Sequence, residues 1–216
     1  MKKSVRMKAA APVGDVDDIV RRLELLTKKK KNESYRFGTP TSAERIRAFE
    51  ETHGVTLPEE YSAFLLAAGE GASGPDYGLV TLEHAIKERG ETIYGLADPF
   101  PVPTSTADLL DFAVGGILPV AYGGCSYFTG IITTGPARGE MWFSVEARPG
   151  WVPCWRGAIL GANGKPYAAP ADVDPYRATY DAVLDPVNTT LRIGFAAWYA
   201  SWLEGEEKKL GAGDLS

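Results

Sequence analysis

The sequence predicts an α+β fold: a single domain with N-terminal helices packed on a mostly antiparallel β-sheet and a closing C-terminal helix. Three observations predict it. The first third of the chain has apolar residues at helical spacing, residues 117–145 hold short apolar segments between glycine-rich turns, and residues 191–202 carry an aromatic stripe. With 216 residues, 44% of them hydrophobic, the chain can bury one substantial core.

A first helix is predicted over residues 15–30. Its start is acidic and its end holds the lysine run 28–31, which is the charge order that the helix dipole favours. We interpret residues 1–35 as a basic N-terminal extension with this one helix, and the lysine run as a solvated helix end rather than a nucleic-acid patch. The apolar residues at helical spacing are Val16, Ile19, Val20, Leu23 and Leu26.

Two further helices are predicted before residue 70. Residues 41–44 read Thr-Ser-Ala-Glu, a capping-box pattern in which the Thr41 hydroxyl and the Glu44 carboxylate bind each other's backbone amides. The second of these helices has Pro58 at its first position and ends near Gly69. Its expected buried face consists of Tyr61, Phe64, Leu65 and Ala68.

The remainder of the chain is predicted to be β-rich, with a closing helix. Residues 78–82 are a short strand candidate and residues 83–89 one or two helical turns; the loop 90–108 and the irregular segment 150–188 are insertions. The domain proper is placed at 36–205, with a tail at 206–216. A meander is predicted from strands at 117–122, 127–134 and 140–145.

Charge and composition narrow the function classes. Residues 1–36 carry 11 Lys or Arg against 5 Asp or Glu, whereas residues 37–216 carry 12 against 23. The folded body is therefore acidic, which disfavours direct nucleic-acid binding. No apolar run is long enough for a membrane span, and residues 1–15 lack the hydrophobic core of a secretory signal, so we expect no membrane association and a cytoplasmic location. Cys125 and Cys154 are expected to be two reduced core thiols.

No catalytic or cofactor motif lies between the structural elements that its chemistry requires. Residues 69–74 satisfy G-x-G-x-x-G, but a helix precedes them and a turn follows, the reverse of a dinucleotide site. The two histidines, His53 and His84, are 31 positions apart and form no metal-binding pair, so no metal and no cofactor is expected. A pairing of Cys125 with His84 stays open, but the chain is not expected to be an enzyme.

The order of motifs between residues 41 and 78 resembles the N-terminal signature of the SUKH superfamily, which includes the fungal cell-wall-assembly regulators of the Smi/Knr type. The most specific part is L-P-x-x-Y-x-x-F-L at residues 57–65, joined to the glycine-rich exit at 69–78. The apolar segment 117–121 and the aromatic helix around 195–203 agree with it. The resemblance implies a non-catalytic protein-binding domain, and its bacterial members resemble immunity proteins that neutralise nuclease-type toxins.

That resemblance implies a protein partner, a basic toxin domain, for which an acidic body offers complementary charge. Two alternatives stay open: a regulatory interaction module without a toxin partner, and a small-molecule-binding protein that uses the Trp-rich segment with Trp151, Trp155 and Tyr167. Partner choice tends to reside in exposed acids and aromatics on variable loops. The candidate partner-binding residues are Asp76, Glu140, Glu146, Trp151, Asp172 and Asp174.

Overall fold

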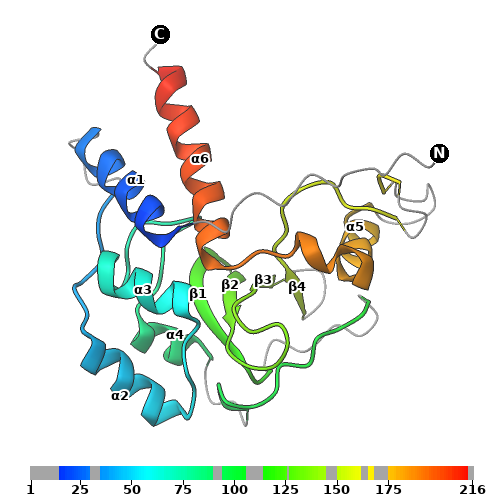
Figure 1. Ribbon diagram of the computed structural model, residues 1–216, viewed down its shortest axis with the longest axis horizontal. Helices are drawn as coiled ribbons and strands as arrows, with labels where there is room; N and C mark the ends of the chain where they lie inside the picture. The colour runs from blue at the N-terminus through cyan, green and yellow to red at the C-terminus, as the bar shows by residue number, and fades with distance from the viewer. Residues whose placement is uncertain are drawn as a thin grey trace, which may run out of the picture.

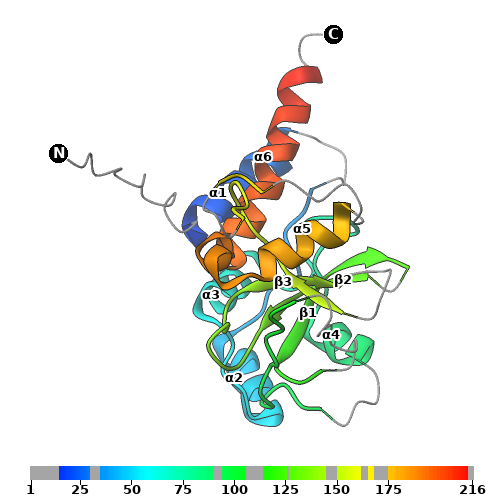
Figure 2. The same ribbon diagram turned by 90° about the vertical axis from the view of Figure 1, so that its right-hand side faces the viewer.

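The computed structural model describes residues 15–29, 35–89, 94–105, 114–125, 127–144, 150–161, 165–167 and 175–213. Helices α1 to α4 gather on one side of the sheet, α5 lies at the other end, and α6 projects beyond both (Figures 1 and 2). The predicted α+β class is confirmed. The elements are α1 (Val16–Lys29), α2 (Ala43–His53), α3 (Glu59–Ala68), α4 (Leu82–Arg89), β1 (Ile117–Gly124), β2 (Tyr127–Ile132), β3 (Met141–Ser144), β4 (Trp151–Pro153), α5 (Pro175–Leu184), the 3-10 helix η2 (Pro186–Leu191) and α6 (Phe195–Gly213).

The sheet is an antiparallel meander with the order β1-β2-β3-β4. Ile117 pairs with Ile132, and the register between β1 and β2 shifts twice, after Pro119 and after Tyr122. Irregular pairing at Pro119 follows from its chemistry, because proline has no N–H to donate to the ladder. The three strands predicted between residues 117 and 145 are confirmed, and β4 adds a fourth.

The larger core joins α1, α3 and α6 to β1. Figure 1 shows α1 and α6 side by side at the top of the molecule. Phe64 of α3 lies between two rings of α6, 4.9 Å from the Phe195 ring centroid and 4.8 Å from that of Tyr199. Tilted ring pairs at this spacing stabilise a core beyond their buried area. Most of the predicted apolar faces are buried, while Val16, Val20, Trp198 and Trp202 are half-buried. The buried members are Ile19, Leu23, Leu26, Tyr61, Phe64, Leu65, Ala68, Phe195 and Tyr199.

A carboxylate of α3 fixes where α6 begins. The backbone N–H of Ala196, in the first turn of α6, donates to Glu60 Oε2 at 3.0 Å. The first N–H groups of a helix lack partners within the helix, and a negative charge there also interacts favourably with the helix dipole. Glu60 therefore joins the start of α6 to α3, at a point 136 residues earlier in the chain.

The smaller core lies between the sheet and the segment 150–188, for which the sequence predicts irregular structure. Trp142 and Trp151 are fully buried in it, and the Phe100 ring meets Trp142 edge-on at 5.0 Å. The prediction of an irregular segment at 150–188 is wrong, because the described part contains β4, α5 and η2. All three residues of β4 are buried, and β4 pairs with β3. Burial and pairing together explain why a regular strand forms here.

Three other local predictions are corrected. Ser42, not Thr41, is the N-cap of α2, and its hydroxyl accepts from Arg45 N at 3.2 Å. The strand expected at 78–82 is a single bridge between Leu79 and Ala121, because α4 already begins at Leu82. Cys125 is exposed in a turn rather than buried in the core, whereas Cys154 is half-buried; both are free thiols.

Candidate functional site

The glycine-rich loop 69–78 is tied to its neighbours by backbone hydrogen bonds. Thr39 and Glu70 exchange both of theirs, at 2.7 and 2.9 Å. Gly69 has a φ of +83°, and a Cβ added to it would lie 2.6 Å from the Thr39 carbonyl oxygen. Only glycine permits that conformation and that approach, so the first glycine of the G-x-G-x-x-G string serves the packing of the loop.

At its tip, this loop presents an aromatic side chain. Tyr77 is 78% exposed, yet its backbone N–H donates to the Tyr122 carbonyl at 3.1 Å, and the two rings are 5.8 Å apart. A Cβ on Gly124 would lie 2.8 Å from Tyr77 Cε2, so the ring rests against the end of β1. Asp76, at φ +56°, completes the feature that we call the Tyr77 ridge: Asp76, Tyr77 and Tyr122.

The Glu70 cleft lies on one side of this ridge. It has a volume of about 660 Å³, and its lining includes Glu70, Tyr77, Tyr122, Thr81 and His84. His84 Nε2 lies 3.2 Å from Glu88 Oε1, one helical turn further along α4. The lining of the cleft therefore combines the two aromatic rings of the ridge with polar groups.

The side chain of Glu70 is only 3% exposed, and its carboxylate accepts four hydrogen bonds. Arg45 donates to it from Nε at 2.5 Å and from Nη2 at 3.3 Å, while Thr41 Oγ1 and the Leu82 backbone N–H each donate at 3.0 Å. Burial alone raises the pKa of a carboxyl group, but the bonds from Arg45, Leu82 and Thr41 outweigh it and lower the pKa of Glu70. Glu70 is thus an ionised structural link between α2, the loop and α4.

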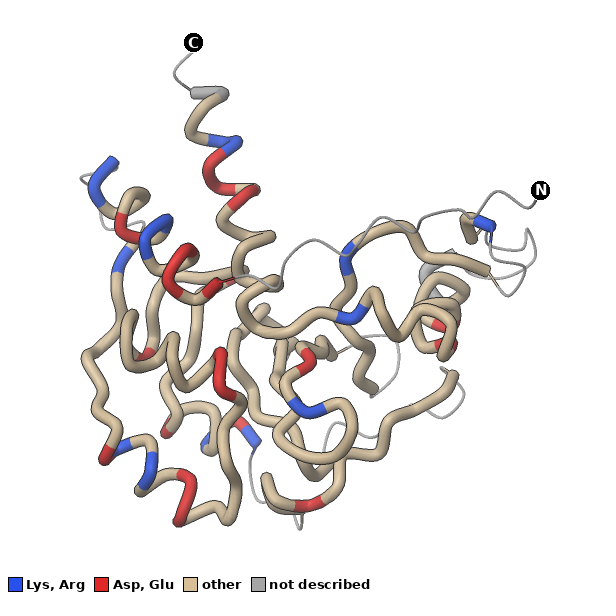
Figure 3. The backbone as a smooth tube through the Cα atoms, in the orientation of Figure 1, with Lys and Arg blue, Asp and Glu red and all other residues tan. Residues whose placement is uncertain are grey.

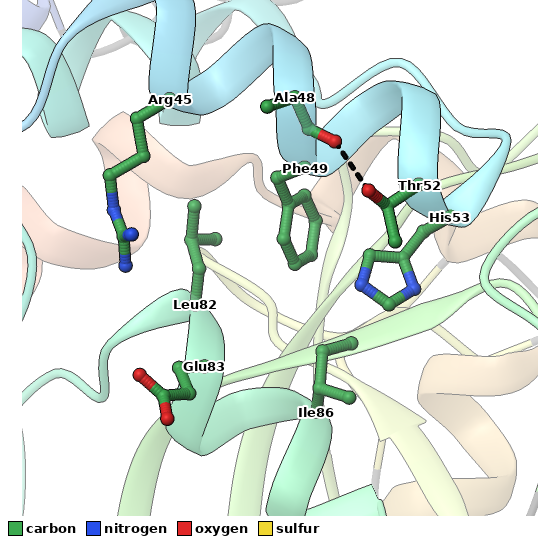
Figure 4. A pocket seen from close by; sticks show the side chains of 8 residues that line it. All are labelled: Arg45, Ala48, Phe49, Thr52, His53, Leu82, Glu83 and Ile86. Atoms are coloured by element: carbon green, nitrogen blue, oxygen red, sulfur yellow. Dashed lines mark hydrogen bonds between the residues drawn. The ribbon is translucent and has the colours of Figure 1, made fainter.

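A second hollow, the α2–α4 groove, has a volume of about 380 Å³. In Figure 4, Phe49 and His53 of α2 point toward Leu82 and Ile86 of α4, with Arg45 at one end. The Phe49 and His53 rings are 4.5 Å apart. Burial, and after it the Arg89 charge, lowers the pKa of His53, which favours a neutral imidazole at pH 7.

A third hollow, the aromatic pocket, adjoins the ridge at Asp76, which is part of its lining. Its volume is about 360 Å³. The Tyr127 hydroxyl is buried and has no hydrogen-bond partner among the described residues. Burial also raises the pKa of the Cys154 thiol, which keeps it protonated. The pocket is lined by Asp76, Gly123, Tyr127, Phe128, Thr129, Phe143, Ser144, Cys154 and Trp198.

The candidate residues named from sequence fall in different places. Asp76 is exposed on the Tyr77 ridge. Glu140 is half-buried, where Trp142 Nε1 donates to it at 3.0 Å, and it lines none of the three hollows. The expectation that Trp151 is exposed is wrong, since only 1% of it is, and the small core encloses it. Glu146, Asp172 and Asp174 lie outside the described residues.

The sequence did not predict the aromatic residues of the Tyr77 ridge and of the aromatic pocket. Tyr77 stands between Pro75-Asp76 and Gly78, in a turn, where a large ring has few neighbours to pack against. That position was a usable signal for an exposed aromatic residue. Tyr127, Phe143 and Trp198 gave no such signal, because they come from β2, β3 and α6 and meet only in the folded chain.

In the part of the chain that the structure describes, no group of three or more His, Cys, Asp or Glu is placed to hold a metal ion. None of the described helices combines the length and the apolar character that crossing a bilayer requires.

Comparison with known proteins gave one match. Neither the curated proteins nor the solved structures contain a match to this chain. The model of the SMI1/KNR4 family (SUKH-1) matches residues 40–155, more than half of the chain, and this range includes α2, α3, α4 and the whole sheet. The resemblance inferred from residues 41–78 is confirmed, and the chain belongs to the SMI1/KNR4 family (SUKH-1).

Proposed function

We propose that this protein is a non-catalytic protein-binding domain that acts in the cytoplasm as an immunity protein, neutralising a cognate bacterial toxin of the nuclease type. The observation that carries the proposal is family membership over residues 40–155, since proteins of this family are generally immunity proteins. The fold and its surface supply two further arguments.

The Tyr77 ridge has the character of an interface anchor. Residues that dominate a protein interface are commonly tyrosine, tryptophan or arginine, and a rigid side chain loses little conformational entropy on binding. Tyr77 is 78% exposed, but backbone hydrogen bonds and the Tyr122 ring hold its position before any partner arrives. The Glu70 cleft and the aromatic pocket beside the ridge offer recesses for the partner's side chains.

The acidic charge of the family-matched range also supports binding to a basic partner. The family-matched range, residues 40–155, contains 6 Lys or Arg and 15 Asp or Glu, a net charge of −9. Toxins that act on nucleic acid present basic clefts, and an acidic surface finds and covers such a cleft quickly. Association is therefore expected to weaken as salt screens the two surfaces.

The test is binding to the purified toxin domain encoded beside this gene, measured by isothermal titration at 50 and 300 mM salt. We expect tight association that weakens at the higher salt, and relief of the toxin's nuclease activity by an equimolar amount of this protein. Absence of binding at 50 mM salt would contradict the immunity proposal.

Variants test the ridge separately. Tyr77→Ala is expected to weaken binding at least 10-fold. Tyr94→Ala is the matched control, because Tyr94 is also an exposed tyrosine, at 46%, but lines none of the three hollows. If both variants bind as the unmodified protein does, the Tyr77 ridge lies outside the interface.

A further inference from the structure

The aromatic pocket has a composition suited to a cation. Four aromatic side chains line it, Tyr127, Phe128, Phe143 and Trp198, and no basic residue does. Tyr127, Phe143 and Trp198 are only half-buried, so part of each ring stays open to the hollow. The face of an aromatic ring carries negative charge density that attracts a cation placed over it.

Asp76 adds a full negative charge at the rim. A Cβ built on Gly123, which also lines the pocket, would lie 3.6 Å from Asp76 Oδ2, so the carboxylate lies against the pocket wall. Asp76 has no ion-pair partner among the described residues. A cation in this pocket would therefore meet aromatic surface and an uncompensated carboxylate together.

Arginine suits these walls better than lysine. Its planar guanidinium stacks on aromatic rings, is weakly hydrated and binds a carboxylate through two parallel N–H groups, whereas the lysine ammonium is a strongly hydrated point charge. The hollow of about 360 Å³ has room for a long side chain. The net charge of −9 over residues 40–155 favours a basic protein as the source of that side chain.

We propose that the aromatic pocket receives an arginine side chain of a basic partner protein, with Asp76 as its counter-ion and the rings of Phe143, Tyr127 and Trp198 as its walls. This inference rests on the proposed function, since it names the group of the partner that enters the surface beside the Tyr77 ridge. Arginine is also one of the residues that most often dominate interface energetics.

The first experiment needs no partner. The full chain, labelled with 15N, is titrated with N-acetyl-arginine amide, and N-acetyl-lysine amide and N-acetyl-leucine amide serve as comparison probes. We expect saturable shifts at the Trp198 indole and at the backbone N–H groups of Thr129 and Ser144 with the arginine probe, and at least threefold weaker binding of the lysine probe. Equal binding of all three probes, or shifts elsewhere only, would overturn the assignment.

Variants identify the groups responsible. Asp76→Asn keeps the shape of the side chain and a residue type that tolerates positive φ, and it is expected to weaken the arginine probe at least fivefold. Phe143→Leu is expected to weaken it similarly. Glu51→Gln, which removes an exposed charge on α2, is the control and should change affinity less than twofold. An unaffected Asp76→Asn variant would overturn the role of the carboxylate.

The same variants are then measured against the cognate toxin domain. Weakening by Asp76→Asn of at least 10-fold, with Glu51→Gln unchanged, supports the pocket as an arginine site of the interface. If the toxin binds all variants equally, the pocket inference fails while the immunity function stands. If the unmodified protein binds no toxin but does bind the arginine probe as expected, the proposed function fails and the chemistry of the pocket stands.

Discussion

The glycine-rich loop and the residue before β3 each hold a glutamate, one buried and one half-buried, with opposite effects of folding on its pKa. Glu70 of the loop accepts four hydrogen bonds, two of them from Arg45, and its pKa is lowered. Glu140, immediately before β3, accepts one from Trp142 Nε1, and the cation paired with it, Arg192, lies 3.7 Å away; burial therefore prevails and the pKa of Glu140 is raised. The count of donors and the distance of the cation, rather than burial alone, decide which form of the carboxyl group folding favours.

The largest expected effect is that of Glu70→Ala, which should lower the free energy of unfolding by about 3 kcal/mol. The Leu82 N–H and the Thr41 hydroxyl lose their acceptor, and Arg45 loses its counter-ion. Urea unfolding at pH 7 measures it. Glu51→Ala, at an exposed position of the same helix as Arg45, is the control and should stay within about 0.5 kcal/mol. A Glu70→Ala cost below that of the control variant would contradict the structural role of Glu70.

The pH dependence of Glu70→Gln sharpens the comparison. Because the pKa of Glu70 is lower in the folded protein than its usual value of 4.5, its carboxylate contributes stability above about pH 4.5 that is lost as the pH falls through the folded pKa. Glu70→Gln should cost about 2 kcal/mol at pH 7 and progressively less in acid. Urea unfolding between pH 7 and pH 3 measures the difference; a constant difference across that range would show that the charge of Glu70 contributes nothing.

The smallest effect is expected for Glu140→Gln, which should leave stability unchanged or raise it by up to about 1 kcal/mol at pH 7. Glutamine keeps an acceptor for Trp142 Nε1 and removes the buried charge. A raised folded pKa means that the stabilisation is complete below pH 4.5 and is lost as the pH rises through the folded pKa, so the gain should shrink in acid. Thermal melts at pH 7 and pH 4 test it. A loss above 1 kcal/mol at pH 7 would mean that the pair with Arg192 outweighs burial.

Local patterns predicted the fold because its main elements depend on residues close in sequence. Apolar spacing was enough for α1, α3 and α6, whereas Gly123-Gly124, predicted as the first turn of the meander, are the last residues of β1 and the turn follows at Cys125. The capping of α2 was misassigned because Thr41, with Glu44 three positions later, fits the capping box, whereas the residue that caps, Ser42, has Arg45 at that position. The Thr41 hydroxyl instead donates a hydrogen bond to Glu70, 29 positions later in the chain. No periodicity in the sequence reveals that contact.

The candidate site could be predicted only in small part. Asp76 was chosen by residue type and stays a proposal, while Trp151 was chosen by the same reasoning and is buried. Whether a tryptophan in a proline-rich segment packs or faces solvent depends on strand pairing, here of Ser144 with Trp151. The pocket beside Asp76 draws on β2, β3 and α6, so its residues could not be grouped before the fold was known.

The pairing of α1 with α6 has a consequence for synthesis of the chain. Figure 3 shows basic and acidic segments on both helices, and Arg22 donates two hydrogen bonds to Glu207, at 2.9 and 2.8 Å, across 185 positions. At about 5 to 20 residues per second, a ribosome takes roughly 10 to 40 s to add that stretch. During this interval α1 can pack against α3 but not against α6, so part of its apolar face stays exposed to solvent. Asp17 and Asp18 in its first turn and Lys28 and Lys29 in its last flank the buried residues, and charges in such flanking positions generally disfavour aggregation.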